Sequence, residues 1–153
     1  MYKRQVLRAG DALGLEVARK LGAAAVFAES TEEGRAASIR AAVRATAADT
    51  AGLLVALADQ PFLEPRDFAA LLAEFRRAAQ GIVRARYADE PGTPVVFSRR
   101  YFPELLQLAG RDGGRKVIAD HADQVRFVDL PPERGRDLDT PEDLPAKRQR
   151  ETS

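Results

Sequence analysis

The sequence contains no cysteine and a single histidine, His121, in 153 residues. Without cysteine, the chain has no disulfide framework, no thiolate metal site and no cysteine nucleophile. A zinc site is also disfavoured, because zinc in proteins is held mainly by cysteine and histidine side chains. A chain without cysteine is compatible with a reducing compartment, and we expect the protein to be cytoplasmic. His121 is expected at the end of a helix, and we assign it no catalytic role.

Long apolar runs and an excess of one charge are also missing. The 24 Lys and Arg residues nearly balance the 23 Asp and Glu residues, which leaves a formal net charge of +1. No global field would therefore recruit nucleic acid or an anionic membrane surface. No apolar run approaches the length of a bilayer span, and no signal-peptide core follows the first residue. We expect a soluble protein with no nucleic acid or membrane partner.

The pattern of apolar and polar segments predicts one domain, because 153 residues that are 45% hydrophobic and 31% charged supply one ordinary core. Strands and helices alternate with short connections, which is typical of an α/β fold whose mostly parallel sheet is covered on both faces. The domain is predicted at 1–144, followed by a polar tail at 145–153. Strands are predicted at 5–7, 23–27, 53–58, 82–87, 94–97 and 125–130, with a turn at 89–92, and helices begin near residues 11, 32, 65, 102 and 115.

The apolar run from Leu53 to Ala58 ends abruptly in Asp59, Gln60 and Pro61. This pattern places Asp59 at the carboxyl tip of a buried strand. In open α/β sheets that edge is where ligands bind, and a carboxylate there can hold Mg²⁺ against the phosphates of a nucleotide. The competing interpretation is an aspartate that starts a turn before a proline.

Four segments occur in the order found in the MobA-like nucleotidyltransferases: 58–61, 92–97, 110–115 and 137–144. The chain resembles this family from Val6 to Leu144, and most closely its molybdenum cofactor cytidylyltransferase branch. The resemblance implies a three-layer, Rossmann-like nucleotidyltransferase fold that uses Mg²⁺ and a nucleoside triphosphate. The terminal phosphate of the acceptor would attack the α-phosphate and release pyrophosphate. For this branch the donor would be CTP and the acceptor a molybdopterin-type cofactor.

The resemblance makes Asp59 the first metal ligand and catalytic residue, because Mg²⁺ takes one or two carboxylates and fills its other positions with phosphate oxygens and water. The second ligand would come from Asp137 or Asp139, which alternate so that only one faces the site in an extended segment. We prefer Asp139 and keep Asp137 in reserve. The competing interpretation is helix capping by Asp139 or Thr140 ahead of Pro141.

Other family motifs supply candidates for nucleotide or acceptor binding. The segment 92–94 resembles a Gly-His-Pro turn of the family with Thr93 in place of histidine, and 110–115 resembles a glycine-rich segment that ends in arginine. Gly34 and Ser38 resemble a segment near the nucleotide. Each motif has a structural alternative: a tight loop, a turn between helices and an ordinary helix start. The binding candidates are Gln60, Pro61, Gly34, Ser38, Gly92, Thr93, Pro94 and Arg115.

Arg84 and Arg86 alternate along a predicted strand and therefore share one face of it. With Arg115 they could converge on one anionic ligand. A solvated sheet edge would produce the same pattern.

One departure from the family concerns the start of the sequence. Related families open with a strand and a loop of the form Leu-Ala-Ala-Gly-x-Ser-x-Arg-Met-Gly, followed by lysine, which hold the base and triphosphate. Here the first residues lead directly into the family's second strand. We expect an amino-terminally truncated gene product or a mis-called start that lacks the family's first strand and loop, and the activity of the chain as written stays open. The alternatives are a non-catalytic domain of the same fold, which binds an acceptor or partner, and a sugar-1-phosphate or other nucleotidyltransferase.

Overall fold

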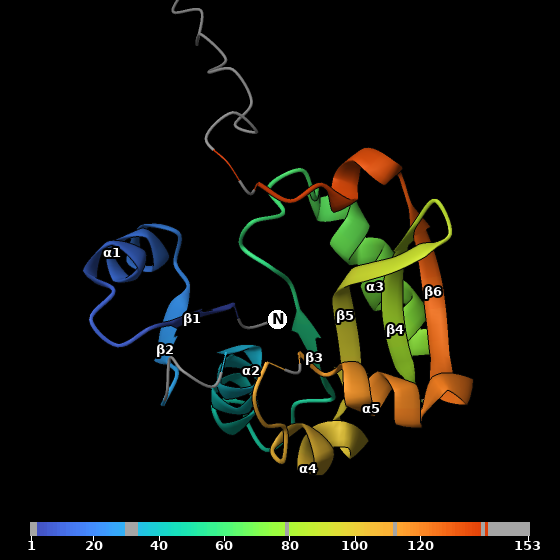
Figure 1. Cartoon of the computed structure of the whole chain (residues 1–153), viewed down its shortest axis with the longest axis horizontal. Coiled ribbons are helices and arrows are strands. Elements are labelled where there is room, and N and C mark those ends of the chain that lie inside the picture. Colours follow the sequence, from blue (N-terminus) through green and yellow to red (C-terminus); the bar gives the residue numbers. More distant parts are fainter. Residues whose placement is uncertain (1–2, 30–33, 79, 112, 139, 141–153) are drawn as a thin grey trace, which may run out of the picture.

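The computed structural model describes residues 3–29, 34–78, 80–111, 113–138 and 140 (Figure 1). Strands and helices alternate from Arg4 to Tyr87, as the sequence predicts. The longest helix in these ranges has 13 residues, and none of the helices described is both long and apolar enough to cross a membrane. The elements are β1 (Arg4–Leu7), α1 (Ala12–Lys20), β2 (Ala24–Phe27), α2 (Gly34–Arg44), β3 (Gly52–Val55), α3 (Pro65–Arg77), β4 (Ile82–Tyr87), β5 (Glu90–Ser98), α4 (Phe102–Leu105), α5 (Arg115–Asp120) and β6 (Val125–Leu130), with short 3₁₀ turns at Arg99–Tyr101, Ala122–Gln124 and Pro132–Gly135.

The strands form two sheets among the described residues. One contains β1 and β2 as a parallel pair, and the other has the order β3-β5-β4-β6. In the larger sheet β5 runs antiparallel to β3 and to β4, whereas β4 and β6 are parallel. It follows that β3, β4 and β6 point in the same direction and β5 opposes them. The predicted α/β fold is confirmed, and its one antiparallel strand lies inside the larger sheet.

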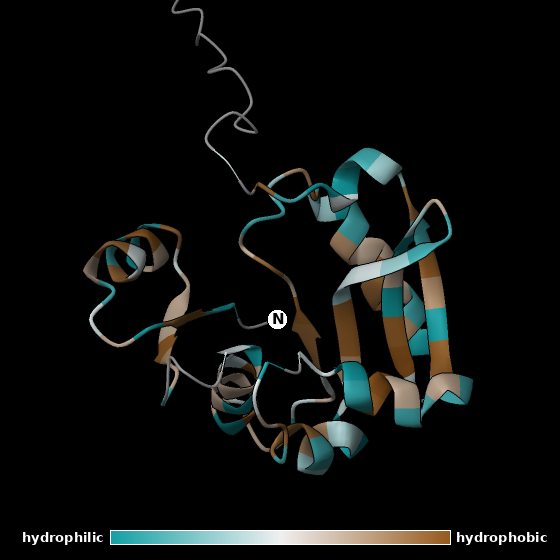
Figure 2. Ribbon diagram, viewed as in Figure 1, coloured by the Kyte–Doolittle hydropathy of each residue, from teal (hydrophilic) through white to brown (hydrophobic). Residues whose placement is uncertain are grey.

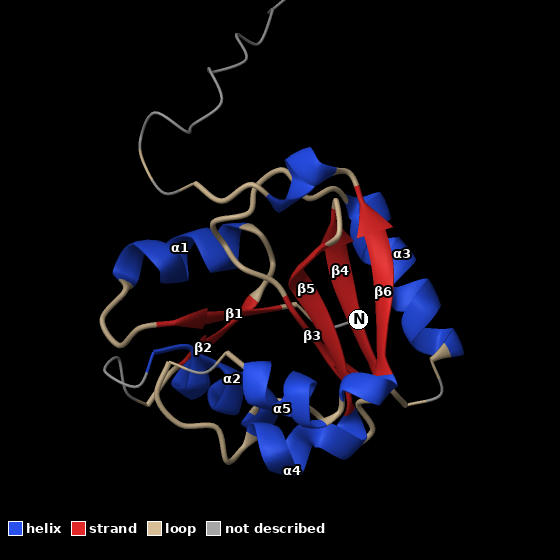
Figure 3. Cartoon of the chain, turned by 45° about the vertical axis from the view of Figure 1, so that its right-hand side comes forward, coloured by secondary structure: helices blue, strands red, loops and turns tan. Residues whose placement is uncertain are grey.

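Helices cover both faces of the larger sheet (Figures 1 and 3). Alternation along β4 and β5 sends neighbouring side chains to opposite faces. Ile82 and Phe97 pack in one core with residues of α2, α4 and α5, while Val83 and Val96 pack in a second core with Leu71 of α3. The apolar character of these strands is visible in Figure 2. This is the three-layer arrangement that the family resemblance implies.

The unit of β1, α1 and β2 is less covered than the larger sheet. On α1 only Ala18 is buried, although Leu13, Val17 and Leu21 recur at helical spacing. These three side chains are 73%, 46% and 68% exposed. In the part of the chain that is described, β1 and β3 each pair with a single strand, so each has one edge without a neighbour.

The hairpin between β4 and β5 differs from the predicted turn at 89–92. Its turn consists of Ala88 and Asp89, whose φ angles are +43° and +72°, and β5 begins at Glu90. Two successive positive φ angles match the twist of the flanking strands and allow a tight hairpin. Pro91 and Pro94 are tolerated in β5 because they lie beyond the residues that pair with β3. The predicted bounds of β4 and β6 match the observed ones.

Gly114 is a position where the backbone requires glycine. It has a φ of +89°, and a Cβ there would lie 3.1 Å from Cζ of Phe97. Gly110 also has a positive φ, +64°, but a Cβ there would meet no atom within 4 Å. We expect Gly110→Ala to lower the free energy of unfolding by about 1 kcal/mol, which is the left-handed backbone cost alone. Gly114→Ala should cost about 2 kcal/mol or more, as measured by denaturant titration. Equal losses of unfolding free energy in Gly110→Ala and Gly114→Ala would show that the Phe97 ring moves aside at no energetic cost.

Candidate active site

The loop after β3 carries the first candidate metal ligand. β3 ends at Val55, so the predicted strand through Ala58 is too long, and Asp59 lies in a turn rather than at the strand tip. Val55 is the last residue of β3 that pairs with β5, so Ala56 and Ala58 lie beyond the sheet. Asp59 is exposed, and its carbonyl accepts a hydrogen bond of 2.8 Å from the backbone N–H of Leu138. The two acidic motifs are therefore joined directly.

Gln60 connects three segments that are distant in the sequence. Its side chain is buried, with 8% exposed. The amide nitrogen Nε2 donates to Oδ1 of Asp137 at 2.9 Å, and Oε1 accepts from the hydroxyl of Thr93 at 2.7 Å. The hydroxyl of Tyr87 donates to the carbonyl of Thr93 at 2.6 Å. We call Gln60, Tyr87, Thr93 and Asp137 the Gln60 network. The network fixes both polar atoms of the Gln60 side-chain amide and holds the Asp137 carboxylate beside the loop that carries Asp59.

Tyr87 was not predicted as a site residue. The only signal in the sequence is an aromatic residue at the end of a strand ahead of a hairpin, and that pattern is common in ordinary sheets. Its role follows from its contact with Thr93, which the sequence did select as a binding candidate. Pro94, which follows Thr93 after a cis peptide bond, is buried.

The carboxylates of Asp59 and Asp137 suit a magnesium ion held against phosphates. Both side chains are exposed, and Asp137 is oriented by the Gln60 amide. Within the described ranges, no group of three or more acidic or histidine side chains could form an all-protein metal cage. Magnesium does not require one, since it binds through one or two carboxylates together with substrate phosphates and water. Asp139, the preferred second ligand, lies outside the described residues, so the pairing of Asp59 with either aspartate stays a prediction.

The pKa of Tyr87 provides a test of this arrangement. Burial, and then the carboxylates of Asp67 and Asp137, raise that pKa from 10.0 to about 12. Because the pKa of Tyr87 is higher in the folded than in the unfolded chain, its neutral phenol adds to the free energy of unfolding below pH 10. This contribution is lost as the pH rises towards 12. We expect Asp137→Asn to lower the pKa of Tyr87, as measured by the ultraviolet absorbance of tyrosinate and assigned with Tyr87→Phe. Asp123→Asn should leave it unchanged, and an unchanged value in Asp137→Asn would place that carboxylate away from the phenol.

Two glycine motifs meet at the start of α2. Gly34 has a φ of +59°, and a Cβ there would lie 3.3 Å from Cγ of Arg111. A Cβ on Gly113 would lie 3.2 Å from Cδ of Arg35. The structure therefore brings the segment that begins at Gly34 against the loop that precedes α5. Ser38 is half-buried on α2.

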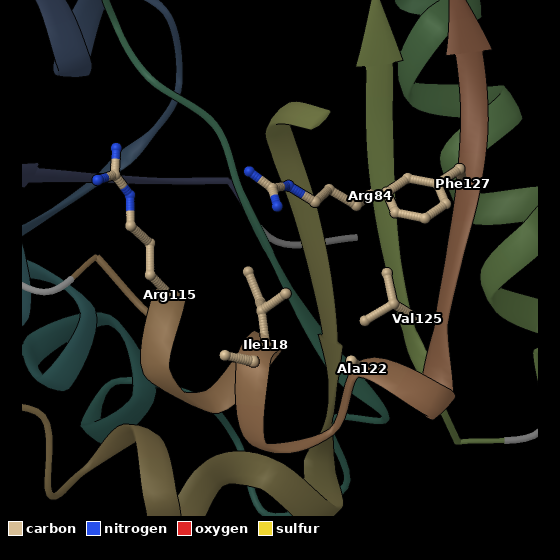
Figure 4. Close-up of a pocket in the computed structure, with 7 residues that line it drawn as sticks. Arg84, Arg115, Ile118, Ala122, Val125 and Phe127 are labelled. Carbon is tan, nitrogen blue, oxygen red and sulfur yellow. The ribbon is translucent and has the colours of Figure 1, made fainter. Parts of the chain in front are cut away.

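Arg84 and Arg115 line one hollow of about 400 Å³ on the face of the sheet beside α5 (Figure 4). We call it the arginine hollow; it is lined by Arg84, Arg115, Ile118, Ala119, Ala122, Val125 and Phe127. Arg86 does not join them, because its guanidinium forms an ion pair with Asp129 at 2.6 Å and lies over the ring of Phe127. Two of the three arginines considered in the sequence analysis thus converge, and the third is engaged by a carboxylate.

Residues 3–125 match the family described as the MobA-like NTP transferase domain. The chain belongs to this family. A search of curated proteins found no match. Among solved structures, Rv0371c from Mycobacterium tuberculosis H37Rv is 30% identical, with a TM-score of 0.77 over 92% of this chain and 72% of that one. A structure of Rv0371c in complex with manganese is 28% identical, with a TM-score of 0.70 over 85% of this chain and 68% of that one.

Molybdopterin-guanine dinucleotide biosynthesis protein A from Archaeoglobus fulgidus has the same fold. It is 19% identical, with a TM-score of 0.59 over 90% of this chain and 73% of that one. The family match confirms the predicted resemblance and places this MobA-like chain among the nucleotidyltransferases, whose substrates are a nucleoside triphosphate and an acceptor. The fold brings the Asp59, Thr93 and Asp137 motifs to one place, where the sequence could only give their order.

Proposed function

We propose that this MobA-like chain transfers CMP from CTP to a molybdopterin-type cofactor in a Mg²⁺-dependent reaction that releases pyrophosphate. The observation that carries the proposal is the junction of the two acidic motifs. The carbonyl of Asp59 accepts from the N–H of Leu138, and the side chain of Gln60 holds Asp137. Two carboxylates on adjoining loops at the end of β3 are suited to holding a metal–triphosphate complex.

In the proposed reaction, an oxygen of the acceptor's terminal phosphate attacks the α-phosphorus of CTP. The bond between that phosphorus and the bridging oxygen to the β-phosphate breaks, and pyrophosphate leaves with the electron pair. Asp59 and either Asp137 or Asp139 would hold Mg²⁺, which would neutralise the charge that the two anionic reactants bring together. Gln60 keeps the Asp137 carboxylate oriented before the substrates arrive, so no reorganisation is needed during the reaction.

The other predicted site residues are assigned by their position. Gly34 and Ser38 lie on α2, whose first residues lie against Arg111 and Gly113, and we propose that part of the nucleotide binds there. Thr93, which replaces the histidine of the family motif, contacts Gln60 and so belongs beside the metal ligands. CTP is an intracellular metabolite, and we therefore propose the cytoplasm as the site of action.

The test is pyrophosphate release with CTP, GTP, ATP or UTP, each with a molybdopterin-type acceptor or with a sugar 1-phosphate. Release that requires Mg²⁺, CTP and the molybdopterin-type acceptor is the expected result. Preference for a sugar 1-phosphate would replace the proposed acceptor. Absence of release with every pair, together with absence of Mg²⁺-dependent CTP binding by calorimetry, would favour a non-catalytic domain.

The same measurements on a chain extended by the in-frame upstream sequence test the expectation that a glycine-rich loop belongs ahead of β1. CTP binding by the extended chain alone would support that expectation. Equal binding by both chains would show that Asp59 and its partners suffice.

A further inference from the structure

Arg134 connects the segment after β6 with the loop that leads from β3 into α3. It lies in the 3₁₀ turn at Pro132–Gly135, and its Nη1 donates to the carbonyl of Phe62 at 2.7 Å. The same nitrogen lies 2.5 Å from Oε1 of Glu64, and Nε lies 3.7 Å from Oδ2 of Asp67. We call the contacts of Arg134 with Phe62 and Glu64 the Arg134 clamp.

The guanidinium of Arg134 is largely buried. The side chain of Arg134 is 12% exposed and that of Asp67 is 5% exposed. Nε of Arg134 is buried and donates no hydrogen bond within the described part of the chain. A buried ion pair adds little net stability, because desolvation of both charges offsets their attraction, and a buried donor without an acceptor lowers stability further. The clamp therefore restricts geometry more than it stabilises the fold.

The segment that follows Arg134 runs beside the loop after β3 (Figures 1 and 3). The contacts join the two segments in opposite chain directions: Arg134 with Phe62 and Glu64, Arg136 with the ring of Phe62, Asp137 with Gln60, and Leu138 with Asp59. Only three residues separate Arg134 from Asp137, which is about 10 Å of fully extended chain. The clamp therefore limits where the Asp137 carboxylate can lie relative to the Asp59 loop.

The 3₁₀ turn also packs against the Gln60 network. A Cβ on Gly135 would lie 2.8 Å from Cδ2 of Tyr87, so the phenol ring lies directly against the backbone of the turn. The hydroxyl of Tyr87 donates to the carbonyl of Thr93 on β5. The turn that carries Arg134 thus contacts both the loop after β3 and the end of β4.

We propose that Arg134 is a positioning residue of the candidate active site, which sets the separation of the Asp59 and Asp137 carboxylates by clamping together the two segments that carry them. Its described contacts include neither carboxylate, so it acts through the backbone rather than on a substrate. Magnesium demands nearly ideal octahedral geometry, and its affinity therefore depends on the placement of the carboxylates that hold it. The metal role of these carboxylates rests on the proposed function, whereas the clamp itself does not.

The clamp is tested by the distance between the two segments. The chain contains no native cysteine, so spin labels attach only to introduced residues. Ala58→Cys and Glu133→Cys place one label on each segment at exposed positions, and electron paramagnetic resonance gives the distribution of distances between the labels. We expect Arg134→Gln to broaden this distribution. Arg126→Gln is the matched control and should leave it unchanged, because Arg126 lies on β6 and pairs with Glu74 at 3.5 Å, outside the clamp. An unchanged distribution in Arg134→Gln would overturn the proposal.

The consequence for the site is tested by Mg²⁺ titration of CTP binding in the full chain. Arg134→Gln should raise the Mg²⁺ concentration at half-saturation by about tenfold, since a misplacement of about 1 Å can cost about a hundredfold in rate at a reacting centre. Arg134→Lys keeps the charge but lacks the planar fork of donors, so we expect an intermediate value. Loss of folded protein would lower the amplitude of CTP binding but leave the Mg²⁺ concentration at half-saturation unchanged.

Glu64→Gln tests the clamp without removing the arginine. Its amide oxygen can still accept the hydrogen bond that caps α3, and Arg134 keeps the carbonyl of Phe62, but the ion pair is lost. The distance distribution and the Mg²⁺ concentration at half-saturation should change in the same direction as in Arg134→Gln. Broadened distances with an unchanged Mg²⁺ concentration at half-saturation would overturn the positioning role. Broadened distances in a chain whose unsubstituted form binds no CTP would support the clamp and contradict the proposed function.

Discussion

Replacing Asp59 with asparagine is expected to lower Mg²⁺-dependent CTP binding and CMP transfer by about a hundredfold or more. The amide keeps the size of the side chain but removes the charge that a metal requires. Loss of one electrostatic group aimed at the reacting phosphates typically costs several kcal/mol. Because Asp59 is exposed, the variant should fold normally. Calorimetry with CTP in the presence and absence of Mg²⁺ measures the binding, and pyrophosphate release measures the reaction.

Asp49→Asn is the matched control, because Asp49 is an exposed carboxylate in the loop ahead of β3 rather than after it. It should leave both measurements unchanged. Asp137→Asn should also reduce binding if Asp137 is the second ligand, whereas Asp139→Asn should do so if our preferred ligand is correct. Undiminished CTP binding in Asp59→Asn would remove Asp59 from the metal site and would return it to the alternative of a turn-forming residue.

Phe97→Ala is expected to lower the free energy of unfolding by about 3–5 kcal/mol, which is the usual cost of emptying a large buried site. Phe97 is 1% exposed, sits in the central strand β5 and pairs in register with Leu53 and Ile82. Its ring also contacts the region of Gly114. A loss of this size is a large share of the stability of a small domain. Denaturant titration followed by circular dichroism measures it.

Phe27→Ala provides the control of the same residue type. Phe27 lies at the end of β2 with 47% of its surface exposed, so its removal should cost about 1 kcal/mol or less. Similar losses of unfolding free energy in the two variants would mean that Phe97 in the larger sheet contributes no more to stability than Phe27 in the unit of β1, α1 and β2.

Local pattern was sufficient where side-chain alternation and turn chemistry agreed. Alternation between Ile82 and Tyr87 and between Val125 and Leu130 gave both strands with their observed bounds. Pro65 marked the start of α3, where Glu64 and Asp67 form a reciprocal cap.

Local pattern failed where tertiary contacts opposed it. The turn signal of Pro91 and Gly92 is stronger than that of Ala88 and Asp89, yet the chain turns at the latter pair because β5 must continue beside β4. The apolar run was extended to Ala58 because hydrophobicity alone does not show where a strand loses its pairing partner. β5 pairs with β3 only as far as Val55, and the strand ends there.

The sequence by itself determined the fold class, the family and the identity of the acidic and glycine-rich motifs, because these depend on residue type and order along the chain. The tertiary structure decided which of those residues meet. Gln60 contacts Asp137 and Thr93, which are 77 and 33 residues away. Arg84 on β4 and Arg115 on α5 line the same hollow, although no short-range pattern connects that strand with that helix. Such contacts arise from the packing of whole elements, and their geometry is not encoded in any one segment.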